Sequence, residues 1–463
     1  MRTDKERELF ERSGIVKAVF SLAFPTMIGQ IILVIYNMAD TYFVGLSGND
    51  TMLTAVTVCM PAFMFLSAIS NLFGVGGASV IARALGRGKT GKVRATAAFS
   101  FYGCLLVTMG YSLLAYAGKD LFVDLLGGTD PLVHANAVEY LVCTVVLGGC
   151  ATSVNMLLSH LIRAEGRAIC ASAGIALGGF LNILLDPLFM FVLLPPGREA
   201  LGAAAATALA NLASLVYFTI AMIANRRRSC LSFRPRRDMV RFHIPVDVFS
   251  TGLPACVMTL FENISYAVLD KLMSLYGVAM QAGIGVAKKV NMLAHCSVRG
   301  IAQGALPLIG YTYASGDHKR MREAVRVTRM AAIGLSTLCM VVYLIFAKQA
   351  IGLFIHRESP SLAYGAAFLR ILCVGGPFSA GAYTTISFFQ AAGEGRKSFL
   401  LAILRKGIVD IPLMFLMYSL VPVYGIVAAT PLADGVCCYA AHRILAAYMK
   451  NLAGRDSPCL EKG

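Results

Sequence analysis

A few polar residues interrupt the apolar first half of this sequence, and their chemistry fits a site for a small cation. Asp40, the pair Asn182 and Asp186, and Thr207 lie in three separate apolar runs. Asn182 and Asp186 are four residues apart, which places them on one face of a helix. A charge inside an apolar helix is costly, so its presence needs a reason. Two carboxylates, an amide and a hydroxyl supply hard oxygen ligands that suit a proton or Na+. We therefore take these four residues as the candidate cation-coupling site.

Three more polar residues share a broad helical face with Asp40. Asn37 precedes it by three residues, Tyr36 precedes it by four, and Gln30 lies seven residues before Asn37. This spacing directs Gln30, Tyr36 and Asn37 to the same side of one helix, where we expect them to line a substrate cleft. The alternative is that Asp40 caps a helix end near the membrane surface and that Asp186 caps a helix break at Pro187.

The second half carries a different set of charges. Glu262 lies in one apolar run, and Lys288, Lys289, His295 and Arg299 lie in or beside the next. Positions 288, 295 and 299 fall on one helical face. Glu262 is either a second protonatable site or the counter-ion of a cation on that face. We place Glu262 and Arg299 in the substrate cleft and favour an ion pair between them.

The elements that position these residues are predicted to be membrane-spanning helices. Hydrophobic residues make up 57% of the 463 residues and charged residues only 14%, whereas soluble domains carry about 25% charged residues. Runs of about 20 apolar residues suffice to cross a bilayer. We predict an all-α membrane protein with twelve spans, at roughly 18–45, 52–82, 95–117, 131–160, 168–194, 200–224, 245–275, 278–313, 327–347, 361–391, 398–422 and 424–448.

Other motif-like features carry no chemistry in this sequence. Residues 83–90 end like a phosphate-binding loop, but Arg83 stands where the first glycine is required and an apolar helix precedes the segment instead of a strand. There is no HExxH or GxSxG motif. The thirteen cysteines lack CxxC spacing and mostly lie in apolar runs, so we interpret them as small hydrophobic residues. We expect no enzyme activity, no cofactor, and no metal beyond Na+ at the four residues named first.

The basic residues predict the orientation of the chain. Most of the 41 Lys and Arg residues fall in the tails and in alternate connections, and we count Arg405 and Lys406 in one of these connections. Because basic loops stay in the cytoplasm, both termini are predicted to be cytoplasmic, with the protein in the inner or plasma membrane. The formal net charge of +16 is spread over these segments, so we expect the lipid bilayer and no nucleic acid as partner.

The sequence repeats itself at an offset of 229 residues. Pro25 and Pro254 are separated by this distance, as are Gly48 and Gly277, and the Glu-Gly-Arg triplets at 165–167 and 394–396. Two six-helix lobes are therefore predicted, 1–224 and 244–463, joined by a basic cytoplasmic linker at 225–243. At this offset the partners of Asp40, Asn182 and Asp186 are apolar, so the cation chemistry is predicted to belong to the first lobe; these partners are Leu269, Ile411 and Phe415.

An ordered set of segments along nearly the whole chain resembles the multidrug and toxic compound extrusion (MATE) family. No single segment is decisive, but the set keeps the family's order and spacing. The segments are PTMIGQ at 25–30, YNMADTYFVG at 36–45, RAEG at 163–166, LNILLDPLF at 181–189, GLP at 252–254, GALPLIGY at 304–311 and FQAAGEGR at 389–396.

The resemblance implies two six-helix lobes around a central cleft, with alternating access driven by entry of H+ or Na+. Asp40, Asn182, Asp186 and Thr207 match the family's first-lobe cation site. Glu262 matches an acidic position that some members use. The acidic residue that those members place in the tenth helix is missing, because 361–391 contains no Asp or Glu.

We therefore expect a secondary active antiporter that exports small amphipathic or cationic compounds, most simply as a monomer. The alternative is a flippase for a lipid-linked precursor, because Lys288, Lys289 and Arg299 would make the cleft basic and receptive to phosphates. A receptor or structural role is a third reading, which leaves the many buried ionisable groups without a purpose.

Overall fold

The computed structural model describes residues 4–46, 50–125, 130–195, 197–235, 237–240, 243–355 and 359–456, and these residues form helices and connections without a strand. Two π-helical turns, η1 and η2, interrupt the helices of the first half. Its elements are α1 (Asp4–Glu11), α2 (Ile15–Leu46), α3 (Asp50–Gly86), α4 (Thr90–Ala117), α5 (Lys119–Leu125), α6 (Pro131–Leu141), η1 (Val142–Leu147), α7 (Gly149–Ala164), α8 (Ala168–Leu188), η2 (Phe189–Leu193) and α9 (Glu199–Ala224).

The second half follows after a short 3-10 turn, η3 (Arg237–Val240), and contains a third π-helical segment, η4. Its elements are α10 (Ile244–Ser274), α11 (Val278–Ser315), α12 (His318–Ile351), α13 (Pro360–Val374), α14 (Gly376–Ala392), α15 (Gly395–Ile403), η4 (Leu404–Asp410), α16 (Ile411–Leu420) and α17 (Tyr424–Asp456).

The length and composition of the helices fit a multi-pass membrane protein. In a bilayer the backbone polar groups must pair within the chain, which helices achieve. Among the described residues, 7 helices are long and apolar enough to cross a membrane, or up to 9 if each of two bent helix pairs counts as one span. Each of the twelve predicted runs coincides with one helix or a chain of consecutive helices, but the count of twelve spans stays a prediction.

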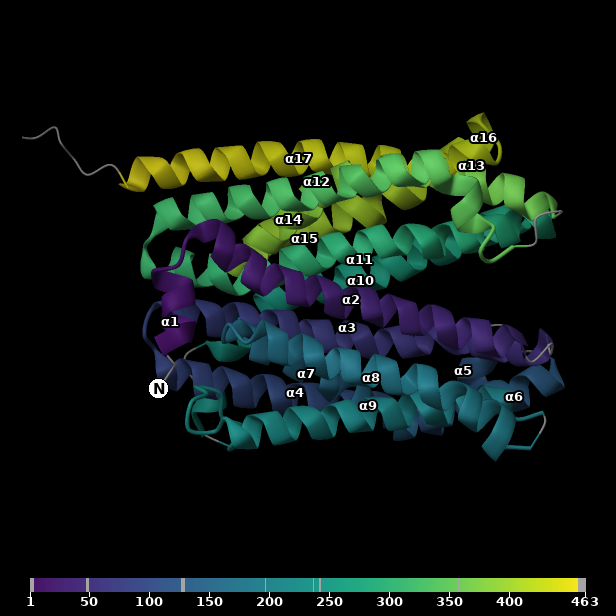
Figure 1. The fold of residues 1–463 in the computed structure, drawn as a ribbon, viewed down its shortest axis with the longest axis horizontal. Helices are drawn as coiled ribbons and strands as arrows, with labels where there is room; N and C mark the ends of the chain where they lie inside the picture. Colours follow the sequence, from purple (N-terminus) through teal and green to yellow (C-terminus); the bar gives the residue numbers. More distant parts are fainter. Residues whose placement is uncertain are drawn as a thin grey trace, which may run out of the picture.

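The helices form two bundles that lie side by side (Figure 1). We call α2 to α9 the first lobe and α10 to α17 the second lobe. Along the seam between them, α2 packs on α11 and α3 packs on α10. The helices approach backbone to backbone here, because a Cβ built on Gly252 would lie 1.8 Å from the Leu72 carbonyl oxygen and one on Gly300 would lie 2.4 Å from the Met27 Cα. Small residues permit such contacts between membrane helices.

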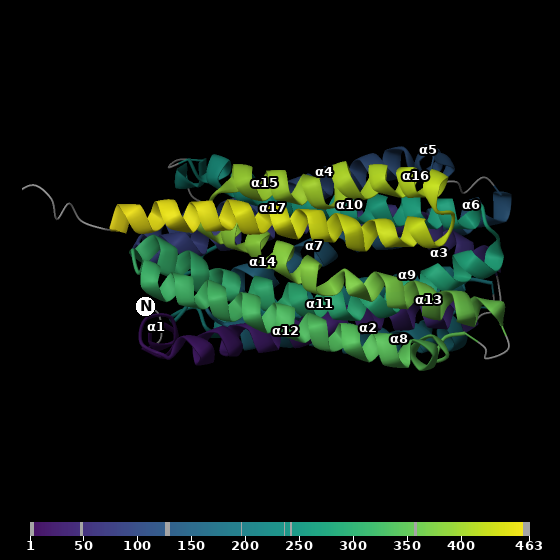
Figure 2. The same cartoon turned by 90° about the horizontal axis from the view of Figure 1, so that it is seen from above.

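The first described helix and the end of the last described helix lie at the same end of the molecule. Helix α1 and the C-terminal end of α17 lie at this end in both views (Figures 1 and 2). We call it the terminal end. Arg320 at the start of α12 fixes α1 there, because its guanidinium donates to the carbonyls of Phe10 at 2.8 Å and Ser13 at 2.7 Å. The segment before α10 is also anchored, since the Glu165 carboxylate accepts from the backbone N–H of Cys230 at 2.6 Å.

Candidate functional site

A cleft between the lobes is lined by side chains from both of them. Its volume, including the part that is open to solvent, is about 1450 Å³. All five residues that the sequence placed in the cleft line it: Gln30, Tyr36, Asn37, Glu262 and Arg299. Further polar groups on the wall come from five helices and were not singled out from the sequence; they include Asn71, Asn155, His160, Asn211, Thr259, Asn263 and Gln303. The cleft therefore combines many neutral hydrogen-bonding groups with one acidic and one basic residue.

Helices α8 and α9 bring Asn182, Asp186 and Thr207 together at one wall of this cleft. The Asn182 amide nitrogen donates to Asp186 Oδ1 at 3.2 Å and also lies 3.1 Å from Thr207 Oγ1. Asn182 and Thr207 line the cleft, whereas Asp186 is fully buried behind them. The amide of Asn182 thus connects the hidden carboxylate to the space between the lobes.

Asp40 completes the group from helix α2. It is only 7% exposed, and its charge interacts with that of Asp186. Asp40 Oδ1, Asn182 Oδ1 and Asp186 Oδ2 are buried and accept no hydrogen bond from the described residues. Buried acceptors without donors are rare, because each loses its hydrogen bonds to water on burial, which costs about 1–3 kcal/mol. A bound proton or Na+ would satisfy them, so the donor set fits the predicted cation.

The helix-capping alternative does not fit the structure. Asp40 lies inside α2, six residues before its end at Leu46, and the chain stays helical past Pro187, because α8 continues to Leu188 and passes into η2. The hydrogen-bond partner of the Asp186 carboxylate is the Asn182 side chain, not a backbone amide. The two carboxylates are therefore buried groups within helices.

Glu262 and Arg299 form the ion pair that the sequence favoured. Arg299 Nη2 lies 2.5 Å from Glu262 Oε2, and the guanidinium also sits over the Tyr383 ring, 5.8 Å from its centre. Of the two interpretations of Glu262, the counter-ion interpretation describes this geometry. Lys288 likewise pairs with Asp270, and Lys289 interacts electrostatically with Asp40.

The second lobe contains a buried charge network that the sequence reading missed. Arg405 Nε lies 2.8 Å from Asp434 Oδ1, and Lys406 Nζ lies 3.0 Å from Asp410 Oδ2. All four side chains are at most 3% exposed. The assignment of Arg405 and Lys406 to a cytoplasmic connection was therefore wrong, because both lie inside the helical segment η4. Lys406 and Asp410 are four residues apart in an apolar run, a spacing that could have indicated the pair.

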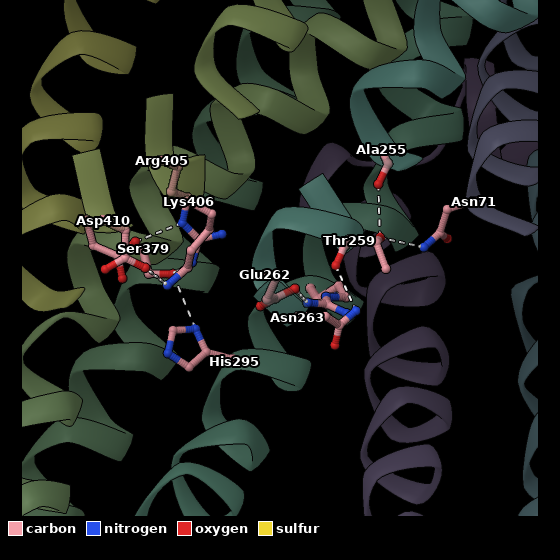
Figure 3. A network of polar contacts seen from close by, with 12 residues as sticks. Asn71, Ala255, Thr259, Glu262, Asn263, His295, Ser379, Arg405, Lys406 and Asp410 are labelled. Carbon is pink, nitrogen blue, oxygen red and sulfur yellow. Dashed lines mark hydrogen bonds and ion pairs between the residues drawn. The ribbon is translucent and has the colours of Figure 1, made fainter. Parts of the chain in front are cut away.

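Hydroxyl and imidazole groups extend this network (Figure 3). Asp410 accepts hydrogen bonds from Ser265 at 2.6 Å and from Thr430 at 3.0 Å. Arg405 Nη2 donates to Ser379 Oγ at 2.5 Å, and that hydroxyl lies 3.3 Å from His295 Nδ1. The second lobe therefore contains a buried polar network at residues other than Glu262 and Arg299, the pair that the sequence favoured.

Metal and disulfide chemistry leave no trace in the described part of the chain. No group of three or more His, Cys, Asp or Glu side chains could hold a metal ion there. Twelve cysteines lie in that part, and all have free thiols.

Comparison with known proteins agrees with this architecture. The chain is 27% identical over 445 residues to a multidrug export protein, MepA, of Staphylococcus saprophyticus, with 96% of each protein covered. It is 27% identical over 444 residues to MepA of Staphylococcus haemolyticus, with 95% of each covered. The fold matches the outward-facing structure of a multidrug resistance MATE family transporter, with a TM-score of 0.90 at 24% identity over 98% of this chain and 100% of the other.

A family model matches both halves of the sequence. The model named MatE covers residues 25–188 and again 254–416, so that the two matches begin at Pro25 and Pro254. Together they span well over half of the chain, which decides the family. The protein belongs to the MatE family, the membrane transporters that its sequence resembles.

Proposed function

We propose that this protein is a secondary active antiporter that exports small amphipathic or cationic compounds in exchange for H+ or Na+. One observation carries the proposal: a cleft shared by the two lobes adjoins two buried carboxylates, each with an oxygen that accepts no hydrogen bond from the described residues. Such carboxylates need either a proton or a cation to be stable in a low-dielectric environment. The multidrug export activity named for the relatives agrees with this proposal.

The contacts of Asn182 supply a route from ion binding to the cleft. When Asp186 gains a proton or coordinates Na+, its oxygens no longer need the Asn182 amide as a donor. Asn182 can then turn towards Thr207 or the cleft, and the charge that Asp40 faces changes at the same time. Repacking of α2 against α8 follows from these changes, and the cleft releases its substrate outwards. Alternating access thus depends on the first lobe.

The proposal includes the topology predicted from the sequence. We propose twelve spans, lobes at 1–224 and 244–463, a linker at 225–243, cytoplasmic termini and a monomeric protein. The position of α1 and the end of α17 at one end of the molecule supports an even number of crossings (Figure 1). Accessibility of single cysteines in the tail and the linker, added to a cysteine-free protein, tests this topology.

A transport assay in proteoliposomes tests the function. The purified protein is reconstituted, and ethidium movement is followed under a pH gradient or a Na+ gradient imposed separately. Export driven by one gradient and abolished by collapsing it is the expected result. Equal ethidium movement with and without either gradient would contradict antiport.

The flippase alternative loses its main support in the structure. It required free basic groups in the cleft, but Arg299 is paired with Glu262, and neither Lys288 nor Lys289 is among the lining residues. The lining contains one carboxylate, that of Glu262, and one guanidinium, that of Arg299, besides the imidazole of His160. The charges of Glu262 and Arg299 compensate each other. A phosphate would therefore meet no net positive charge in this cleft.

A further inference from the structure

A second cavity lies at the terminal end of the molecule, away from the cleft. Its volume, including the part that is open to solvent, is about 450 Å³. The end of α3, the turn that follows it and the start of α4 form most of its wall, and the start of α10 from the other lobe closes it. Four basic side chains and one acidic side chain line it: Arg83, Arg87, Lys89, Lys92 and Asp247.

The charges around this cavity are unbalanced. Lys92 Nζ pairs with Asp247 Oδ2 at 2.6 Å, which accounts for one cation. Among the described residues, Arg83, Arg87 and Lys89 form no ion pair with a carboxylate. Arg83 interacts electrostatically with Asp247, which already pairs with Lys92, and is repelled by Arg87. Three cations around one cavity repel one another unless an anion occupies it.

Arg83 is held at the base of the cavity and touches both lobes. Its guanidinium lies 3.4 Å from the Ser79 carbonyl oxygen, and the Ser79 hydroxyl donates to the Gln390 carbonyl of α14 at 2.5 Å. A Cβ on Gly393 would lie 2.1 Å from Arg83 Nη1, so the guanidinium rests against the end of α14. The cation at the base is therefore positioned by packing and does not extend freely into solvent.

We propose that this cavity binds a phosphate-bearing anion, of the kind carried by the head group of an acidic phospholipid. Basic pockets between membrane helices on the cytoplasmic side bind such head groups. Retention of basic loops in the cytoplasm explains why Lys and Arg are frequent here, but it does not require them to surround a cavity. Arg94 on α4 illustrates the difference, because it is exposed and lies outside the cavity.

The same segment, 83–90, has the ending of a phosphate-binding loop in sequence. The structure places it after a helix, so it lacks the strand-loop-helix frame that cradles a nucleotide. The cavity uses basic side chains where a nucleotide-binding loop uses backbone N–H groups. Its ligand is therefore predicted to be a single phosphate group, not a nucleoside triphosphate.

The ligand would stabilise one conformation of the protein. The cavity requires α3 and α4 of the first lobe to pack against α10 of the second lobe, and the Lys92–Asp247 ion pair joins the two lobes at this point. A ligand that binds one of two conformations shifts the population towards it. Acidic lipid would thus hold the lobes together at the terminal end. The binding site does not depend on transport activity; only its position on the cytoplasmic side rests on the proposed topology.

Calorimetric titration of the full-length protein in detergent tests the site. The probes are dihexanoyl phosphatidylglycerol, dihexanoyl phosphatidylcholine and inorganic phosphate. The test variant is Arg87→Gln with Lys89→Gln, because both side chains are exposed and their replacement leaves the core intact. The matched control is Arg94→Gln with Lys319→Gln, which removes one arginine and one lysine at exposed positions outside the cavity.

We expect saturable binding of phosphatidylglycerol at one site, a dissociation constant at least tenfold larger in the test variant, and a change of less than twofold in the control. Inorganic phosphate binding as tightly as the lipid would support the site and identify a soluble anion as its source. Equal weakening in both variants would mean general surface attraction and would overturn the proposal. So would equal affinity for phosphatidylcholine, or no saturable binding of either anionic probe.

Discussion

The two lobes bury polar groups in opposite ways. In the first lobe, Asp40 and Asp186 keep carboxylate oxygens that accept no hydrogen bond from the described residues. In the second lobe, Asp410 accepts three hydrogen bonds and Asp434 faces Arg405 at 2.8 Å. In the first arrangement the two carboxylates form no ion pair with a described cation, and each keeps one oxygen without a donor, whereas the second arrangement is compensated residue by residue. A site that lacks a cation can take one up, whereas a compensated site has no such capacity.

This difference assigns separate tasks to groups that look alike in the sequence. A buried carboxylate that is fully paired is expensive to disturb, because removing its partner costs about 3–5 kcal/mol. The Lys406–Asp410 pair therefore belongs to the stability of the second lobe. A carboxylate without an ion-pair partner and with one oxygen lacking a donor can change its charge state during the transport cycle, as Asp186 would.

The largest expected effect comes from Asp40. Asp40→Asn keeps the size of the side chain and removes the group that can bind a proton or coordinate a cation by charge. Gradient-driven ethidium export in proteoliposomes should be abolished, while membrane insertion and the unfolding temperature stay close to those of the wild type. Undiminished export would contradict the assignment of coupling to the first lobe.

The next effect concerns the compensated lobe. Lys406→Leu leaves the buried Asp410 carboxylate without its cation and should destabilise the protein by about 3–5 kcal/mol. Thermal unfolding in detergent measures the loss. The double variant with Asp410→Asn should recover most of it, because no unpaired charge remains. If the Lys406→Leu protein were as stable as the Asp40→Asn protein, the proposed difference between unpaired carboxylates in the first lobe and compensated charges in the second would be contradicted.

A smaller effect is expected at the cleft wall. Arg299 and Glu262 are 25% and 14% exposed, so water reduces the cost of separating them. Arg299→Leu should lower stability by about 1–3 kcal/mol, and adding Glu262→Gln should restore it. Comparing unfolding and ethidium export for both variants separates a structural pair from a selectivity element. Normal stability with a shift towards cationic substrates would favour selectivity, and no change in either would refute both.

The smallest single effects should come from Asn182, the hydrogen-bond partner of Asp186, and from Thr207, which contacts Asn182. Asn182→Ala removes both hydrogen bonds and Thr207→Val removes one, each worth about 0.5–1.5 kcal/mol. Each should weaken the dependence of export on the driving cation without abolishing it. The losses should be strongly non-additive with Asp40→Asn, since groups in one network couple. Additive losses would mean that these residues serve separate purposes.

The sequence reveals the first-lobe site more readily than the second-lobe network, for a physical reason. Asn182 and Asp186 interrupt an apolar run at helical spacing, so their shared face can be predicted from the period of a helix alone. The partners Arg405 and Asp434 lie on different helices, and no local pattern joins them. The fixed offset of 229 pairs Asn182 with Ile411 and so misses the adjacent Asp410 by one residue.

The helical architecture was predictable because apolar runs of membrane length leave the backbone few alternatives. The number of crossings was harder to establish, since charges that pair inside a lobe lower the apolar character of its helices. Helix α11, which carries Lys288, Lys289 and Arg299, is an example. Which cations point into the cleft and which are neutralised depends on contacts between helices, and no single run contains that information.

The backbone contact at Gly252 provides a position at which a substitution should change the conformation of the transporter. A methyl group there would collide with the carbonyl oxygen of Leu72, and neither atom belongs to a side chain that can rotate away. Gly252→Ala would therefore act as a wedge driven between α3 and α10. Such a variant is a route to trapping the opposite state of the transporter for structure determination, without a ligand, an antibody or a cross-link.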